Sequence, residues 1–310
     1  MAFPLNATPS LRNGIIIAVS KAEIPKSMNR APAAAGGTLG LRIQRLGTTG
    51  TQVADDRVVV EAPLEIQIHH PTLGGEAVSF GATMRTPGED EFLAAGLLYG
   101  EGIINLPTDI EVVEESTRRP NVINIRLSPN VQLDVQAPVR RFSAGSSCGV
   151  CGTTGLDTAI ARASLLRVEP TGPIDSDVLL RLPGIMRASQ SKFTDTGGIH
   201  ASALFDFTGK MLGLTEDVGR HNALDKLVGQ NLMAGQLPLV NRIVLLSGRV
   251  SFELVQKALR AGVSILAAIG APSSLSVSLA QATGLTLVGF LRDAHCNVYT
   301  HPERLTGKVL

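Results

Sequence analysis

The last third of the chain alternates short apolar runs with helical stretches, and this alternation constrains the fold more than any other feature. The apolar runs cover residues 243–246, 265–269 and 285–291, and helical stretches at 252–260 and 275–282 separate them. Alternation at this spacing predicts parallel strands joined by right-handed crossover helices. The sequence therefore predicts an α/β sheet in this part of the chain.

The predicted sheet has one edge at which a ligand is expected. In open parallel sheets, ligands bind at the carboxyl ends of the strands, where helix N-termini present free backbone N–H groups. Glycines, serines and arginines follow the predicted strands at this edge, namely Ser247, Gly248, Arg249, Gly270, Ser273, Ser274 and Arg292. These groups suit a phosphate, because they allow close backbone approach, donate hydrogen bonds and supply charge. Ordinary strand-to-helix turns explain the same residues equally well.

Upstream of this sheet, the sequence predicts a smaller region that mixes strands with one clear helix. Residues 56–143 mostly alternate like strands. Thr86 is expected to cap a helix and Glu89 to complete its capping box. The helix should end near Gly100 or Gly102, since glycine is the usual residue just after a helix.

Several further elements are expected between the two regions. Residues 156–166 and 177–191 read as helices, the second interrupted at Pro183. Residues 201–207 and 210–214 predict a hairpin, and residues 221–233 another helix.

The predicted domain organisation has three parts. Residues 1–54 carry six basic side chains against a single acid, Glu23, and are expected to form a mostly flexible basic extension. Residues 55–145 are expected to form a smaller mixed α+β domain, and residues 146–310 a larger α/β domain that begins at a cysteine loop.

Charge and hydropathy exclude several classes of protein. The 28 Lys and Arg residues nearly balance the 27 Asp and Glu residues, so no global field attracts the chain to nucleic acid or to an anionic membrane. No apolar run approaches the ~18 residues that a membrane span needs, and residues 14–19 are too short for a signal-peptide core. We therefore expect a cytoplasmic protein, whose three cysteines are kept as thiols in a reducing compartment.

Cys148 and Cys151 form a C-x-x-C motif in a loop rich in glycine and serine. Two sulfurs at this spacing suit a thiol–disulfide switch, half of a metal site, or sulfur relay, and the spacing does not choose among them. No second C-x-x-C completes a zinc site, so no metal is expected, although His200, His221, His295 and Cys296 could converge in space. The H-x-E motif that precedes the cysteines of zinc deaminases is missing.

Four motifs, in order, resemble those of the FdhD family of formate dehydrogenase accessory sulfurtransferases. They are Ser146–Gly152, Thr196–Ala201, Glu216–Lys226 and Ser247–Arg249. The resemblance extends from about Glu61 to Leu305 and leaves out the N-terminal extension.

The resemblance implies a carrier that accepts persulfide sulfur from a cysteine desulfurase. It implies that the sulfur passes to Mo-bis(molybdopterin guanine dinucleotide), bound as a substrate, before the catalytic subunit of formate dehydrogenase is active. It also implies a larger domain similar in fold to cytidine deaminase. Cys148 corresponds to the persulfide cysteine and Cys151 to its partner. The guanine dinucleotide contact corresponds to Phe290, Leu291, Arg292, Asp293, Ala294 and His295.

Several alternatives remain open from the sequence. A chaperone could deliver the guanine dinucleotide cofactor without forming a persulfide, and a thiol–disulfide oxidoreductase could use the same cysteines. The polar residues around the predicted helix start at 221 suit either a structural or a functional use: Asp217 as a cap, His221 paired with Asp225, and Arg220 beside them. His200 and Cys296 are more typical of buried structural residues. Whether the chain forms a homodimer is also open.

Overall fold

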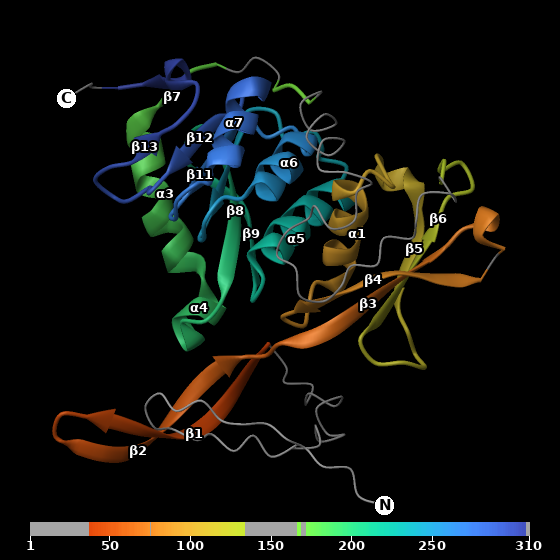
Figure 1. Cartoon of the computed structure of the whole chain (residues 1–310), viewed down its shortest axis with the longest axis horizontal. Helices are drawn as coiled ribbons and strands as arrows, with labels where there is room; N and C mark the ends of the chain where they lie inside the picture. Colours follow the sequence, from red (N-terminus) through yellow and green to blue (C-terminus); the bar gives the residue numbers. More distant parts are fainter. Residues whose placement is uncertain (1–36, 75, 134–165, 169–171, 308–310) are drawn as a thin grey trace, which may run out of the picture. The chain divides into compact units, whose positions relative to one another are not determined.

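The computed structural model describes residues 37–74, 76–133, 166–168 and 172–307, all of which belong to one compact unit (Figure 1). Cys148 and Cys151, residues 1–36 and almost all of the helix predicted at 156–166 lie outside the described residues. The predictions that depend on these segments therefore stay predictions.

The larger sheet has six strands in the order β13-β12-β11-β10-β8-β9. Its strands are β8 (His200–Asp206), β9 (Met211–Asp217), β10 (Arg242–Leu246), β11 (Ile265–Ala268), β12 (Thr286–Gly289) and β13 (Asn297–Val298). Strands β10, β11 and β12 are parallel, whereas β8, β9 and β13 pair antiparallel with their neighbours. Helices α6 (Phe252–Arg260) and α7 (Ser274–Thr283) connect the parallel strands. The predicted alternation of strands and helices and the predicted hairpin are confirmed.

Helices cover both faces of this sheet (Figure 1). Helix α3 (Ser176–Ser189) packs on one face, and α5 (Arg220–Met233), α6 and α7 pack on the other. Successive residues of β10 alternate between the two faces: Ile243 and Leu245 join the cluster that contains α3, and Val244 and Leu246 join the other. Because both faces are buried, the central strands are continuous apolar runs in the sequence.

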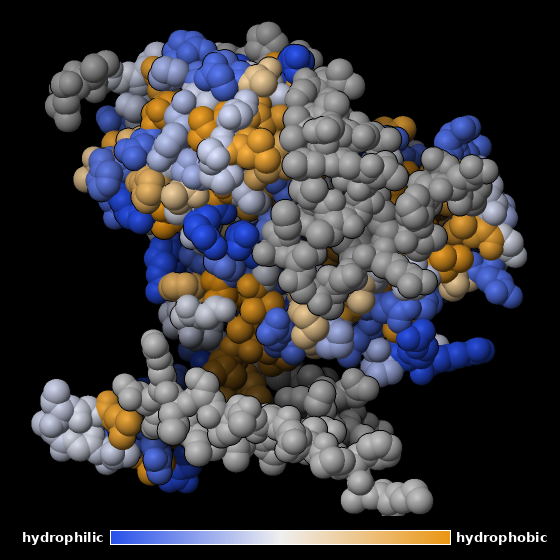
Figure 2. All heavy atoms as spheres, viewed as in Figure 1, coloured by the Kyte–Doolittle hydropathy of each residue, from blue (hydrophilic) through white to orange (hydrophobic). Residues whose placement is uncertain are grey.

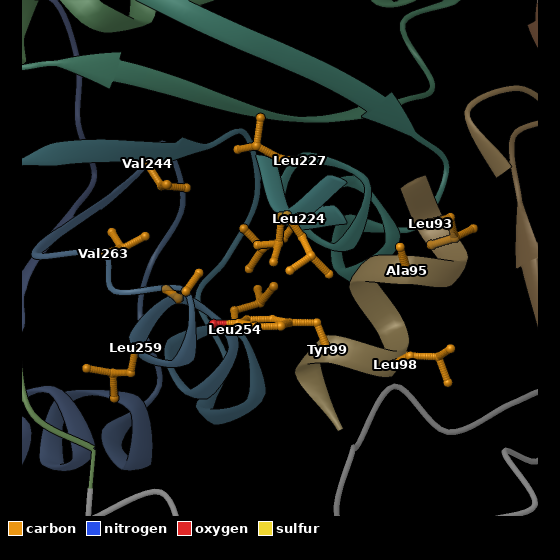
Figure 3. Packing of buried hydrophobic residues seen from close by; sticks show 14 of the residues in the cluster. Leu93, Ala95, Leu98, Tyr99, Leu224, Leu227, Val244, Leu254, Leu259 and Val263 are labelled. Atoms are coloured by element: carbon orange, nitrogen blue, oxygen red, sulfur yellow. The ribbon is translucent and has the colours of Figure 1, made fainter. Parts of the chain in front are cut away.

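A second sheet of four strands precedes the larger one in the chain. Its order is β4-β3-β6-β5, with β3 (Ala62–His69), β4 (Ala77–Arg85), β5 (Ile110–Glu115) and β6 (Val122–Leu127). Helix α1 (Asp90–Gly100) follows β4 and packs against α5 and α6. Its Tyr99 points toward α6, whereas Leu93 and Leu98 point away from these two helices (Figure 3). A single cluster of buried residues includes strands of both sheets.

Shorter elements complete the described part of the chain. Strands β1 (Thr38–Gly47) and β2 (Gly50–Val59) form a hairpin, β7 (Ile174–Asp175) pairs with β14 (Leu305–Thr306), and α4 (Ser191–Thr196) follows α3. The β1–β2 hairpin begins inside the segment 1–54, so residues 38–47 and 50–54 of the predicted extension form regular strands. No helix in the described ranges is long and apolar enough to cross a membrane. Figure 2 shows apolar side chains exposed in patches between hydrophilic ones.

The start of α1 differs from the prediction, although its end at Gly100 is confirmed. The helix begins at Asp90, after Glu89, which adopts a left-handed φ of 59° and makes no side-chain capping bond. Thr86 is fully buried, and its hydroxyl oxygen accepts a hydrogen bond from the backbone N–H of Val218 at 3.1 Å. The predicted capping box is therefore wrong, because a tertiary contact occupies the threonine hydroxyl.

Helix α3 runs through Pro183, so the predicted interruption at this residue is also wrong. A proline inside a helix removes one backbone hydrogen bond and costs about 3 kcal/mol. The apolar face of α3, which includes Leu179, Leu182 and Met186, is buried against the sheet and offsets that cost. The chain breaks instead at Gln190, between α3 and α4.

Candidate functional site

A cleft of about 700 Å³ lies at the carboxyl end of the central strands. The strand side contributes Ser247, Ile269, Leu291, Arg292 and Asp293; the opposite side contributes Pro183, Gly184, Met186, Arg187, Gln190 and Phe193; and Gly197, Gly198, Ile199, His200 and Val218 complete the lining. A cleft of this size accommodates a small organic ligand. The sheet topology thus forms a cleft at the edge that the sequence pattern indicates.

The structure brings some of the predicted site residues to this cleft and places others around it. Ser247, Leu291, Arg292 and Asp293 line it, whereas Gly248, Arg249, Ser273, Ser274, Phe290, Ala294 and His295 are not among the lining residues. The hydroxyl of Ser273 accepts the backbone N–H of Ser276 at 3.3 Å and so caps α7. Cys148 and Cys151 lie outside the described residues, so their position relative to the cleft stays a prediction.

Arg292 ties the ends of two parallel strands together. Its Nη1 donates to the backbone oxygens of Ile269 at 2.6 Å and Leu291 at 3.0 Å. The side chain is exposed, and among the described residues Nε and Nη2 have no partner. Arg292 can therefore hold the strand ends and still donate to an anionic or carbonyl group of a ligand.

The opposite wall of the cleft presents groups that suit a flat ring. The guanidinium carbon of Arg187 lies 4.1 Å from the ring centroid of Phe193. Gln190 is only 3% exposed, and its Nε2 finds no hydrogen-bond partner among the described residues. An unsatisfied buried amide costs roughly 1–3 kcal/mol, so an acceptor on a bound ligand would stabilise this side chain. Sequence reasoning missed these three residues, since no local spacing relates α3, α4 or the residue between them to a ligand.

His200 lies on the wall of the cleft, half-buried and hydrogen-bonded. Its Nδ1 is 3.3 Å from Oγ of Ser247, and that Oγ accepts the backbone N–H of Ala201 at 2.8 Å. Burial lowers the pKa of His200, the nearby charge of Arg220 lowers it further, and Asp217 opposes both. His200 is therefore neutral near neutral pH and can donate or accept one hydrogen bond.

Asp217 has a structural role in the described part of the chain. Its fully buried carboxylate lies 2.8 Å from Nζ of Lys226 and accepts the backbone N–H of Thr86 at 3.1 Å and of Gly219 at 2.9 Å. Lys226 also donates to the backbone oxygen of Thr86 at 2.9 Å. These bonds fix the start of α5 to the turn that precedes α1.

Asp225 and His221 do not pair with each other as the sequence suggested. Asp225 binds Nζ of Lys257 at 2.6 and 2.7 Å, and both side chains are buried between α5 and α6. His221 instead places Nε2 3.1 Å from Oγ of Ser251 and 3.5 Å from the carboxylate of Glu253. Helix packing, rather than spacing along α5, chooses these partners.

Burial lowers the pKa of His221 from 6.5 to about 4, although Glu253 opposes the shift. Below the ordinary pKa, the unfolded chain takes up a proton on this histidine and the folded chain does not. The free energy of unfolding should therefore fall by up to about 3 kcal/mol as the pH drops from about 6.5 to about 4. In His221→Gln, the free energy of unfolding should fall less between these two pH values than in the parent, because glutamine does not take up a proton. Urea titrations at both pH values measure this difference.

A matched control uses an exposed histidine. His295→Gln should lose as much stability on acidification as the parent, because His295 is exposed. Equal losses in the parent and in His221→Gln would show that His221 does not contribute to acid sensitivity.

The remaining candidate ligands form no metal site in the described ranges. No three His, Cys, Asp or Glu side chains gather there as ligands, so His200, His221, His295 and Cys296 do not converge. Cys296 is half-buried and packs against the cluster that contains α3, and burial raises the pKa of its thiol. It is therefore a poor nucleophile.

Comparison with known proteins identifies the family of this chain. The model of the FdhD/NarQ family matches residues 59–306. Curated relatives include the sulfur carrier protein FdhD of Streptomyces avermitilis, 41% identical over 85% of this chain and 94% of the relative. The FdhD of Mycobacterium tuberculosis is 41% identical over 86% of this chain and 97% of the relative. That of Saccharolobus solfataricus is 39% identical over 86% of this chain and all of the relative.

A solved structure supports the fold. A crystal structure from Desulfotalea psychrophila, assigned as a formate dehydrogenase accessory protein, aligns with a TM-score of 0.67. The two chains are 23% identical, and the alignment covers 87% of this chain and 99% of the other. This likeness supports the mixed α/β fold, while its cytidine deaminase-like detail stays a prediction.

Proposed function

Because the chain belongs to the FdhD/NarQ family, we propose that it is a sulfur carrier that serves formate dehydrogenase. The observation that carries this proposal is the identity of 41% to a sulfur carrier protein FdhD across 94% of that relative. In the finer form of the proposal, the chain accepts sulfur from a cysteine desulfurase and transfers it to Mo-bis(molybdopterin guanine dinucleotide), its substrate.

The proposed acceptor is the thiolate of Cys148. It attacks the outer sulfur of the persulfide on the desulfurase, the sulfur–sulfur bond of that persulfide breaks, and the desulfurase cysteine leaves as a thiolate. Cys148 then bears a persulfide, and the outer sulfur of this persulfide is transferred to the molybdenum cofactor. Cys151, three residues on, can resolve this persulfide or receive its sulfur.

The cleft is the proposed site for the nucleotide end of the cofactor. Arg292 offers charged donors at the strand ends, and the Arg187–Phe193 stack faces the same space together with Gln190. An aromatic ring and a guanidinium plane suit a purine base, and a buried amide suits its polar edge. These features support a guanine nucleotide as the ligand.

Intact mass measurement tests the proposed function. The full-length protein is incubated with a cysteine desulfurase, cysteine and the pyridoxal cofactor of the desulfurase, and is then weighed. A one-sulfur adduct is expected. A chaperone that delivers the cofactor without persulfide chemistry would bind guanine nucleotide and give no adduct, and that result would overturn the carrier.

Arg292→Ala should weaken binding of GDP, and Arg249→Ala tests whether an exposed charge two residues beyond the cleft-lining Ser247 also contributes. The substitution of Arg292 removes a charge-assisted contact of roughly 1.5–3 kcal/mol, which corresponds to at least a tenfold loss of affinity in titration calorimetry. Arg126→Gln, an exposed change on β6, serves as the control and should bind like the parent. Unchanged affinity in both test variants would place the nucleotide elsewhere.

A further inference from the structure

Arg220 is a half-buried arginine that has no partner among the described residues. It occupies the first position of α5, a helix of 14 residues. Its side chain forms no hydrogen bond or ion pair there, and its Nε is completely buried without an acceptor. Partial burial of a cation without a counter-ion is costly, so this half-buried and unpaired guanidinium would be stabilised by a bound anion.

The neighbouring carboxylates are already used by other cations. Asp217 lies 2.8 Å from Nζ of Lys226 and also accepts the side-chain amide of Asn222 at 3.1 Å. Glu253 lies 3.5 Å from His221 and 3.8 Å from Nζ of Lys257. Arg220 is therefore available to bind an anion that does not belong to the described residues.

The surroundings of Arg220 suit an oxyanion. The start of α5 has Gly219 at its N-cap with no side-chain capping bond, so its first N–H groups remain as donors. Burial lowers the pKa of His200, which leaves its ring neutral with one N–H to donate near neutral pH. The positive charge of Arg220, the start of α5 and the neutral ring of His200 thus lie near one another.

The backbone at Gly248 lies close to both His200 and Arg220. A Cβ atom at Gly248 would lie 3.2 Å from the His200 ring and 3.6 Å from Cδ of Arg220. His200 and Ser247, the residue before this glycine, both line the cleft. Arg220 therefore lies beside residues that line the cleft, so a ligand in the cleft would lie near its side chain.

We propose that Arg220, the N-terminus of α5, His200 and the backbone at Gly248 form a binding site for a phosphoryl oxyanion. Resting on the proposed function, the site holds the diphosphate of the guanine nucleotide whose base lies in the cleft. The shared chemistry is a phosphate group, which free pyrophosphate also carries. Guanosine lacks phosphate, so its binding reports on the base without the oxyanion.

Titration calorimetry on the full-length protein at about 0.1 M salt, with pyrophosphate, GDP and guanosine as probes, tests the site. The parent should bind pyrophosphate and GDP. Arg220→Gln should weaken both by at least about tenfold and leave guanosine unchanged. Arg220→Lys should keep part of the affinity, because lysine retains the positive charge but lacks the planar guanidinium that can donate two parallel hydrogen bonds. Arg126→Gln, on the other sheet, should match the parent.

Gly248→Ala provides a second variant that leaves Arg220 in place. Its added methyl would lie 3.2 Å from the His200 ring, so this ring must shift and pyrophosphate affinity should fall as well. Equal pyrophosphate affinity in the parent and Arg220→Gln, or no binding by the parent, would overturn the site. A loss for pyrophosphate without a loss for GDP would overturn its assignment to the nucleotide. Sulfur acceptance, measured by mass without nucleotide, reports separately on the proposed function.

Discussion

Cys148→Ala should reduce the one-sulfur adduct on the full-length protein to background, whereas Cys296→Ala should leave it intact. Alanine has no thiolate to attack the donor persulfide, so no bond to the transferred sulfur can form at position 148. Cys296 is the matched control, because burial raises the pKa of its thiol and lowers its thiolate fraction. Both variants are weighed intact after incubation with the desulfurase and cysteine.

Cys151→Ala separates two roles for the second cysteine. If Cys151 resolves the persulfide on Cys148 or receives its sulfur, the adduct should persist and last longer in this variant. An adduct that survives in Cys148→Ala and disappears in Cys151→Ala would place the acceptor at Cys151 instead. The same preparations should activate formate dehydrogenase in proportion to the sulfur that they carry.

Gly96→Ala should destabilise the protein by about 3 kcal/mol or more, or prevent folding altogether. Gly96 on α1 and Gly229 on α5 lie where the two helix backbones touch. A Cβ at Gly96 would lie 1.9 Å from the backbone oxygen of Asp225, and one at Gly229 would lie 1.9 Å from that of Phe92. No rotamer relieves such a contact, because a Cβ is fixed to its own backbone and meets backbone on the other helix.

Helix propensity alone predicts the opposite sign, since alanine inside a helix is favoured over glycine by roughly 1 kcal/mol. Gly184→Ala in α3 is the matched control, because the nearest heavy atom to its added methyl would be Oδ1 of Asp293 at 3.9 Å. This variant should be as stable as the parent or more stable. Urea unfolding of the three proteins decides between the two effects, and a Gly96→Ala protein as stable as the parent would contradict the close helix crossing.

Local patterns predicted the larger sheet because its physical cause is local. Strands buried on both faces must be apolar throughout, and their crossover helices must have an apolar side, so β10, α6 and β11 can be located from the sequence alone. The same logic predicted the hairpin of β8 and β9. It failed at Thr86 and Pro183, where partners distant in the sequence outweigh the local signal for a cap or a break.

The sequence by itself determined the βαβ order, the strand edge at which a ligand is expected and the thiol chemistry available at Cys148 and Cys151. Only the tertiary structure decided which side chains meet across that edge. Thr86 and Asp217 are 131 residues apart, yet they form one buried network. The positions of Arg187, Gln190 and Arg220 in the sequence do not predict whether each side chain forms a hydrogen bond or an ion pair. Ion pairs and hydrogen bonds over such separations depend on how helices and sheets pack, and this packing pairs Asp217 with Lys226 and leaves Arg220 without a partner in the described part of the chain.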